Sequence, residues 1–317
     1  MKIKAVMNKP TYKRMHSMGW AALLLLLCLP GCNKPGQETS GPAQFQLLEK
    51  ERTGLDFENV LNQSAEFNVF AYMYFFNGGG VAAGDVNNDG LVDLYFTSNM
   101  GPNKLFLNEG NLRFRDVTDA AGVAGQEGWT SGVSMVDINN DGLLDIFVSQ
   151  GGNFGVIQGR NQFYICQGLK DGVPFYEDKA ATYGLDFSGF ATQAAFLDYD
   201  RDGDLDVFLL NHTIHQNGTF GRRIDFQGKQ SEVSGDRLMR NDSEGDTIRF
   251  TDVTTDAGIY STVIGYGLGI VVGDINRDGW PDIYIGNDFH ENDYLYINQQ
   301  GGTFRESLTE QMMHTSR

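Results

Sequence analysis

A nine-residue pattern occurs four times in this chain, with oxygen-bearing side chains at positions 1, 3, 5 and 9 and glycine at position 6. The four copies are residues 85–93 (DVNNDGLVD), 137–145 (DINNDGLLD), 198–206 (DYDRDGDLD) and 274–282 (DINRDGWPD). Alternate residues of a tight loop can direct their side chains toward one point, and glycine permits the sharp turn. The pattern therefore predicts about four Ca²⁺ sites, with Mg²⁺ disfavoured because it requires strict octahedral geometry.

Each loop is expected to coordinate the metal through four side chains and the backbone carbonyl of position 7. The predicted metal ligands are Asp85, Asn87, Asp89, Leu91, Asp93, Asp137, Asn139, Asp141, Leu143, Asp145, Asp198, Asp200, Asp202, Asp204, Asp206, Asp274, Asn276, Asp278, Trp280 and Asp282. The alternative is that Asp- and Gly-rich turns only connect strands. A turn does not require Asp at position 9 in every copy, however, and converging carboxylates would repel one another without a cation.

The segments around the loops resemble β-strands, which distinguishes the loops from EF-hands, whose loops lie between helices. After the first loop, short apolar and β-branched runs occupy residues 93–98, 103–108 and 114–118, and a Gly- and Ala-bearing run precedes it at 80–84. Similar runs surround the other loops, whose starts lie 52, 61 and 76 residues apart. A unit of this length with four strands predicts an all-β fold, a β-propeller of four-stranded blades.

The N-terminal residues form a separate segment. Residues 1–31 begin with basic side chains and contain an apolar run that is too short to span a bilayer, which is typical of a signal peptide. The run ends in LPGC (29–32), so Cys32 is expected to carry lipid and residues 32–54 to form a tether; an ordinary signal peptide is the alternative. Residues 55–317 are assigned to the blades, with 55–79 packing on the first blade or adding a strand to it.

Charge and cysteine content limit the possible partners. The formal charge is −17, and it becomes −22 without residues 1–31, which hold five basic and no acidic side chains. Such an acidic chain is not expected to bind nucleic acid. Once Cys32 carries lipid, Cys166 has no disulfide partner, and it is expected to be a small core residue.

A few polar residues outside the loops are further candidate sites. His212 and His215 have His-x-x-His spacing, which is compatible with zinc or with a solvated loop, and no third ligand is evident nearby. His290 lies in an acidic stretch that could line the central channel as a ligand patch or form a polar turn. The pair Arg222 and Arg223 is either solvated or in contact with an acidic neighbour.

Taken with their flanking strands, the loops resemble the FG-GAP/VCBS repeat family, the calcium-loop propellers also found in integrin α-subunit heads. Residues 77–85 (NGGGVAAGD) and 279–288 (GWPDIYIGND) carry a narrower resemblance to lipoproteins of the ASPIC-UnbV group of Bacteroidota. Propellers of the family usually have about seven blades, and the narrower group continues into a C-terminal domain. The resemblance therefore implies that these four blades are an N-terminal fragment of a larger propeller protein.

The resemblance implies calcium-stabilised recognition at the cell surface. The expected function is a membrane-anchored, extracytoplasmic binding or scaffold module for a protein or glycan, at the outer membrane of a Gram-negative bacterium. A part of a polysaccharide-processing enzyme and a truncated fragment without function are the alternatives. The chain has no nucleophile elbow, phosphate loop or His-Glu-x-x-His motif, so no catalytic residue or organic cofactor is assigned. The sequence does not specify an oligomeric state.

Overall fold

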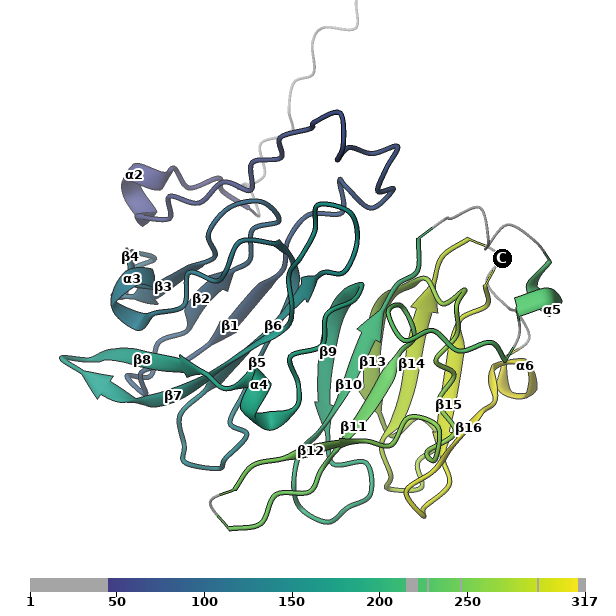
Figure 1. The fold of residues 1–317 in the computed structure, drawn as a ribbon. Helices are drawn as coiled ribbons and strands as arrows, with labels where there is room; N and C mark the ends of the chain where they lie inside the picture. The colour runs from purple at the N-terminus through teal and green to yellow at the C-terminus, as the bar shows by residue number, and fades with distance from the viewer. Residues whose placement is uncertain (1–44, 215–221, 227, 246, 290, 313–317) are drawn as a thin grey trace, which may run out of the picture. The chain divides into compact units, whose positions relative to one another are not determined.

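The computed structural model describes residues 45–214, 222–226, 228–245, 247–289 and 291–312 (Figure 1). The chain divides into two compact units, Met1–Leu47 and Leu48–Arg317, and the second holds all the described sheets. The signal segment and Cys32 lie outside the described residues.

In the described residues sixteen strands form four antiparallel sheets, and in each sheet the strands follow chain order. Blade 1 consists of β1 (Val81–Gly84), β2 (Asp93–Phe96), β3 (Lys104–Asn108) and β4 (Phe114–Asp116). Blade 2 consists of β5 (Trp129–Val136), β6 (Asp145–Gly151), β7 (Gln162–Lys170) and β8 (Val173–Asp178). Blade 3 consists of β9 (Ala191–Leu197), β10 (Asp206–Asn211), β11 (Arg237–Asn241) and β12 (Phe250–Asp252). Blade 4 consists of β13 (Gly267–Gly273), β14 (Asp282–Asn287), β15 (Tyr294–Asn298) and β16 (Phe304–Glu306).

This arrangement is a four-bladed β-propeller, so the predicted fold class is confirmed (Figure 1). The described helices are single turns: α2 (Lys50–Thr53), α3 (Thr118–Ala121), α4 (Ala180–Tyr183), α5 (Arg223–Phe226) and α6 (Leu308–Gln311). None of the helices in the described ranges has the length and hydropathy needed to cross a membrane.

Strand alternation explains how neighbouring blades share a core. Successive side chains of a strand point to opposite faces of its sheet, so β6 directs Ile146 and Val148 toward blade 1 and Phe147 toward blade 3. Blades 3 and 4 share a third core, which includes Phe208 and Ile283. Every residue named here is fully buried. Burying a side chain of this kind contributes about 1.5–3 kcal/mol, which makes these interfaces the main source of stability.

The innermost strands pack in succession, β1 against β5, β5 against β9 and β9 against β13. Small residues permit this approach: a Cβ added to Gly132 would lie 2.4 Å from the carbonyl oxygen of Thr192. The glycine expected in the inner strand is therefore required by backbone proximity. In blades 1 and 4 the innermost strands are more exposed to solvent, since Val81 on β1 is 60% exposed and Val271 on β13 is 64% exposed.

The segment before β1 reaches further than the sequence indicated. Its first part packs on blade 1, where Phe57 stacks on Phe96 with ring centroids 5.0 Å apart. Its aromatic continuation leaves blade 1: the ring of Tyr72 contacts Trp129 of blade 2, and the ring of Tyr74 lies 4.6 Å from that of His212, beyond the end of β10. The segment thus fastens three blades together, and it adds no strand to the sheet of blade 1.

His212 is the polar centre of this contact. Its Nε2 lies 2.8 Å from the Tyr72 hydroxyl, and its Nδ1 lies 3.1 Å from Thr192 Oγ1, which donates to the carbonyl of Gly267 on β13. Because the Thr192 proton is used in that bond, Nδ1 donates and Nε2 accepts. Burial lowers the His212 pKa to about 3, so the ring is neutral. Both nitrogens of His212 are engaged and the residue is buried, so His212 is neither a solvated loop residue nor free to bind zinc; His215 lies outside the described residues.

Candidate metal centre

The four predicted loops connect the first and second strands of the four blades, and they are called loops 1 to 4 in chain order. Each has a residue with left-handed backbone at position 4, with φ between 56 and 64; these residues are Asn88, Asn140, Arg201 and Arg277. The glycine at position 6 has φ between 84 and 101 in every loop. A Cβ added to Gly90 would meet no atom within 4 Å. The glycine is therefore required by backbone conformation and not by space, as the sequence predicted.

Loops 1, 2 and 4 share the same network of hydrogen bonds within the loop. In loop 1, Asp85 accepts hydrogen bonds from the backbone N–H groups of Asp89 at 3.1 Å and Gly90 at 2.8 Å. The side-chain amide of Asn87 donates to Asp89 Oδ2 at 3.0 Å, and the Asn87 carbonyl oxygen accepts from the backbone of Asp89. The same bonds recur in loops 2 and 4. Side-chain oxygens from positions 1, 3 and 5 are thus drawn together around one point.

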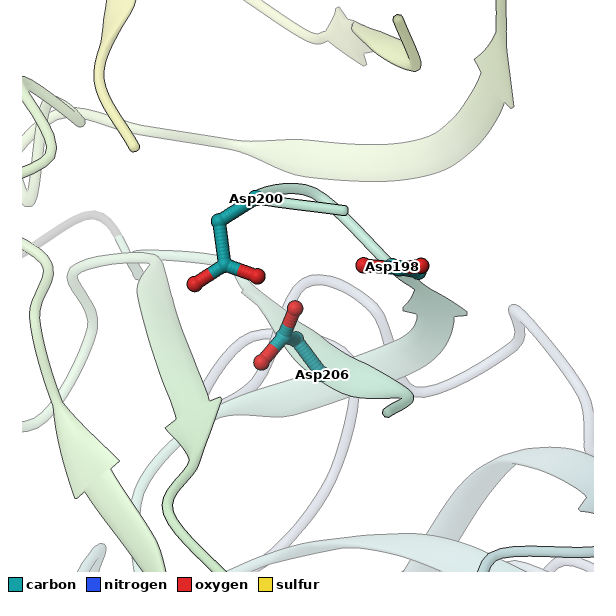
Figure 2. A group of neighbouring side chains, drawn as sticks. All are labelled: Asp198, Asp200 and Asp206. Carbon is teal, nitrogen blue, oxygen red and sulfur yellow. The ribbon is translucent and has the colours of Figure 1, made fainter. Parts of the chain in front are cut away.

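Loop 3 differs because Asp200 replaces asparagine at position 3 and has no amide to donate. Carboxylate oxygens of Asp198, Asp200 and Asp206 lie within 4.8 Å of one another (Figure 2). The Oδ1 atoms of Asp198 and Asp200 are buried and have no hydrogen-bond partner. An unsatisfied buried polar atom is costly. Oxygens arranged in this way fit a hard cation, since Ca²⁺ would bind the atoms that the protein leaves unsatisfied.

The aspartate at position 9 has a second role that the sequence did not indicate. In loop 2, Asp145 is fully buried; its Oδ2 accepts from the backbone of Ile138 at 3.1 Å, and its Oδ1 accepts from Cys166 on β7 at 2.8 Å. In the other loops the position-9 carboxylate accepts an equivalent pair of bonds, one from the backbone of the loop residue at position 2 and one from the third strand. Position 9 therefore ties each loop to its sheet, and in loop 2 each oxygen of Asp145 keeps a lone pair for a metal.

Burial strongly affects these position-9 carboxyls. It raises the pKa of Asp145 and of Asp206 to about 7, against the lowering effect of the two backbone N–H groups, and neighbouring loop carboxylates raise it further. Burial raises the pKa of Asp93 as well. The charged forms are therefore disfavoured in the metal-free loops, and a bound dication would favour them.

Adjacent loops contact one another through the residue at position 4. The Asn88 side-chain amide of loop 1 donates to the carbonyl of Gly142 in loop 2 at 2.8 Å. The Arg201 guanidinium of loop 3 lies over the Trp280 ring of loop 4, 5.1 Å from its centroid. The loops of blades 1 and 2, and those of blades 3 and 4, are therefore neighbours in space, so a cation in one can affect the next.

A second repeated contact closes each blade at the far end of the second strand. The residue directly before the third strand accepts a hydrogen bond from the backbone where the second strand ends; these residues are Asn103, Asn161, Asp236 and Asp293. The sequence signal was present, since an Asn or Asp opens this phrase in every unit. Only Asp236 combines an acidic side chain with nearly complete burial, at 3% exposure.

The structure also places the remaining candidates. Cys166 is buried, as predicted, and burial raises the pKa of its thiol. Arg222 pairs with Asp225 at 3.0 Å, and Arg223 pairs with Glu291 at 2.9 Å, so both contact acidic neighbours. His290 lies outside the described residues. The metal ligands assigned from sequence have the positions described above, and their coordination of Ca²⁺ stays a prediction.

A β-propeller whose blades each carry an Asp-rich loop after the first strand belongs to a recognisable class of repeat protein. The FG-GAP-like repeat family matches residues 85–148, and the FG-GAP repeat family matches residues 266–297. These matches cover loops 1, 2 and 4, so the chain contains FG-GAP repeats.

Among known proteins, the chain is similar to cartilage acidic protein 1 from three vertebrates. It is 26% identical to the Xenopus tropicalis protein over 243 residues, which is 75% of this chain and 33% of the relative. It is 26% identical to the Mus musculus protein over 208 residues and 25% identical to the Homo sapiens protein over 222 residues. The chain spans about a third of the length of these relatives.

Proposed function

We propose that this chain is a calcium-stabilised binding or scaffold module that acts outside the cytoplasm. The observation that carries the proposal is loop 3, in which three carboxylates converge and two buried oxygens lack a partner. Loops 1, 2 and 4 repeat its backbone with one amide in place of a carboxylate. Metal that binds only the folded state stabilises it by mass action, so four occupied loops would add several kcal/mol.

The residues at positions 1, 3, 5 and 9 would hold the cation, together with the position-7 carbonyl. In each loop the position-7 backbone N–H already donates to the carboxylate of position 5, for example Leu91 to Asp89 at 2.8 Å. That bond fixes the peptide of position 7 beside the carboxylates. Bound Ca²⁺ supplies positive charge that offsets the mutual repulsion of the carboxylates. The residues therefore favour a structural role for the metal.

The partner is proposed to be a protein or a glycan, and the location to be the outer membrane of a Gram-negative bacterium, through lipid on Cys32. The FG-GAP repeats and the similarity to cartilage acidic protein 1 support an extracellular binding protein. The net charge of −17 opposes nucleic acid as a partner.

Binding of the protein to arrays of glycans and extracellular proteins, in about 1 mM Ca²⁺ and in EDTA, tests this function. We expect saturable retention of a defined subset in Ca²⁺ and its loss in EDTA, because an ordered blade face depends on the loops. Release of a shortened product from an arrayed polysaccharide would instead support the enzyme alternative. Retention that is equal in Ca²⁺ and EDTA would contradict a calcium-dependent module.

Loop 3 is predicted to bind Ca²⁺ more tightly than the other loops. It has four acidic side chains at the ligand positions, where each other loop has three, and ligand charge is one determinant of calcium affinity. Asp200→Asn should weaken the tightest uptake in calorimetric titration by about tenfold, and the reciprocal change Asn276→Asp should create a second tight site. If the tightest Ca²⁺ affinity is the same before and after Asp200→Asn, the charge at position 3 does not determine which loop binds Ca²⁺ most tightly.

A further inference from the structure

A cavity of about 280 Å³ lies where the long insertion after β10 meets blade 4. Three segments that are distant in the sequence line it: residues 223 and 228–230 of the insertion, residues 259–264 before β13, and Glu291 with the start of β15. Backbone bonds hold the first two segments together, since Val263 donates to the carbonyl of Lys229 at 3.0 Å and Ser231 donates to that of Ser261 at 2.9 Å. Backbone hydrogen bonds therefore hold the walls of the cavity in place. Its volume suits one sugar ring.

The acidic side chain at the buried floor of the cavity is already paired with a cation. The Glu291 side chain is 2% exposed and accepts from Arg223 Nε at 2.9 Å. It also accepts a hydrogen bond from the hydroxyl of Tyr294, which is buried beside it. A cationic ligand would find no free anion here, because Glu291 already pairs with Arg223 from the same cavity wall.

The open side of the cavity offers an aromatic ring and a cation. The Tyr260 side chain is 44% exposed, and edge-to-face contacts with Tyr294 and Tyr296, at 5.6 and 6.0 Å, fix its orientation. Lys229 lies with its ammonium 5.1 Å from the centroid of the Phe226 ring. Lys229 also lowers the pKa of Asp225 through its charge, whereas Asp225 forms its close ion pair with Arg222.

We propose that this cavity binds an acidic sugar unit, a hexuronate within a glycan. Its carboxylate would pair with Lys229 and with the outer nitrogens of Arg223, and the apolar face of the ring would pack on Tyr260. Ser261, Thr262 and Gln230 line the same wall. The Thr262 hydroxyl accepts from the backbone of Ile264 and the Gln230 amide donates to Thr255 Oγ1, so the Thr262 proton and the Gln230 carbonyl oxygen remain for ring hydroxyls. This inference rests on the proposed glycan-binding function and assigns it a site and a ligand class. Charge-assisted pairing and an oriented aromatic platform both favour an acidic sugar over its neutral analogue.

Calorimetric titration of the Ca²⁺-saturated protein with oligogalacturonate, oligoglucuronate, and matched neutral glucose and galactose oligomers tests the proposal. We expect saturable binding of a uronate oligomer and at least about tenfold weaker binding of the neutral ones. Lys229→Gln and Tyr260→Ala should each weaken uronate binding by about tenfold, whereas Tyr260→Phe should retain it. Lys104→Gln, on blade 1 and outside the cavity lining, is the matched charge control and should have no effect.

The outcomes separate this proposal from the proposed function. If no uronate binds while Ca²⁺ still raises the melting temperature and other glycans or proteins are retained on the arrays, the ligand class proposed for the cavity is wrong. The proposed calcium-stabilised binding function would still stand. If glutamate or a short acidic peptide binds as tightly as the uronate, the carboxylate alone is recognised and the sugar class is wrong. Uronate binding that persists in both Lys229→Gln and Tyr260→Ala would place the site elsewhere.

Discussion

Replacing Asp145 with alanine is expected to destabilise the protein by about 3–5 kcal/mol even in EDTA. The carboxyl is fully buried and accepts the backbone N–H groups of Ile138 and Cys166, which would lose their only side-chain acceptor. Each buried donor left unsatisfied costs about 1–3 kcal/mol, and the cavity adds to the loss. Urea unfolding followed by circular dichroism measures the change as a lower midpoint with an unchanged slope.

The matched control is Asp141→Ala in the same loop. Asp141 is exposed, and its carboxylate contacts only Asn139 and the backbone of Leu143. In EDTA its loss should cost less than about 1 kcal/mol, and in Ca²⁺ it should remove the stabilisation that loop 2 contributes. Equal destabilisation by both changes in EDTA would mean that Asp145 does not tie the loop to β7.

Asp236→Asn is expected to stabilise the protein at high pH. Burial raises the pKa of Asp236 to about 8, although the backbone N–H of Asn211 favours its charged form. Between pH 4 and pH 8 the folded state therefore holds a proton that the unfolded state has lost. This contribution to stability is complete below about pH 4, declines as the pH rises, and is gone above about pH 8.

The asparagine variant removes this dependence, because its amide oxygen can accept the same bond without a charge, as Asn103 and Asn161 do in blades 1 and 2. We expect the variant to exceed the original chain by roughly 2–4 kcal/mol at pH 8 and to match it near pH 4. Chemical unfolding at a series of pH values in saturating Ca²⁺ measures the difference. A difference that is constant with pH would contradict the raised pKa.

The repeat made the fold predictable from sequence. The number of Asp-rich loops gave the number of blades, and the short apolar and β-branched runs beside them located the strands. Such runs are continuous because a strand that faces two neighbouring blades requires apolar residues on both faces. The glycine at position 6 was predicted for the correct reason, as its positive φ shows. The loop could be recognised although its copies are unequally spaced along the chain, because the same residue types occupy the same positions within every copy.

What sequence could not provide were contacts between distant segments. Nothing near His212 indicates that Tyr72 lies 2.8 Å from its ring, since 140 residues separate them and neither belongs to the repeat. The pairing of Arg223 with Glu291 across the insertion is equally non-local. The dual role of Asp145 was missed for a different reason: its ligand role already explained its presence, and its burial depends on how β7 packs against the loop.

Thermal unfolding in EDTA, in about 1 mM Ca²⁺ and in about 1 mM Mg²⁺ tests the central claim most directly. Ca²⁺ held by the four loops binds only the folded state, so we predict that it raises the melting temperature by roughly 5–10 °C over EDTA, with a much smaller rise in Mg²⁺. Melting temperatures that agree in EDTA and in Ca²⁺ would show that the loops are turns between strands and hold no calcium.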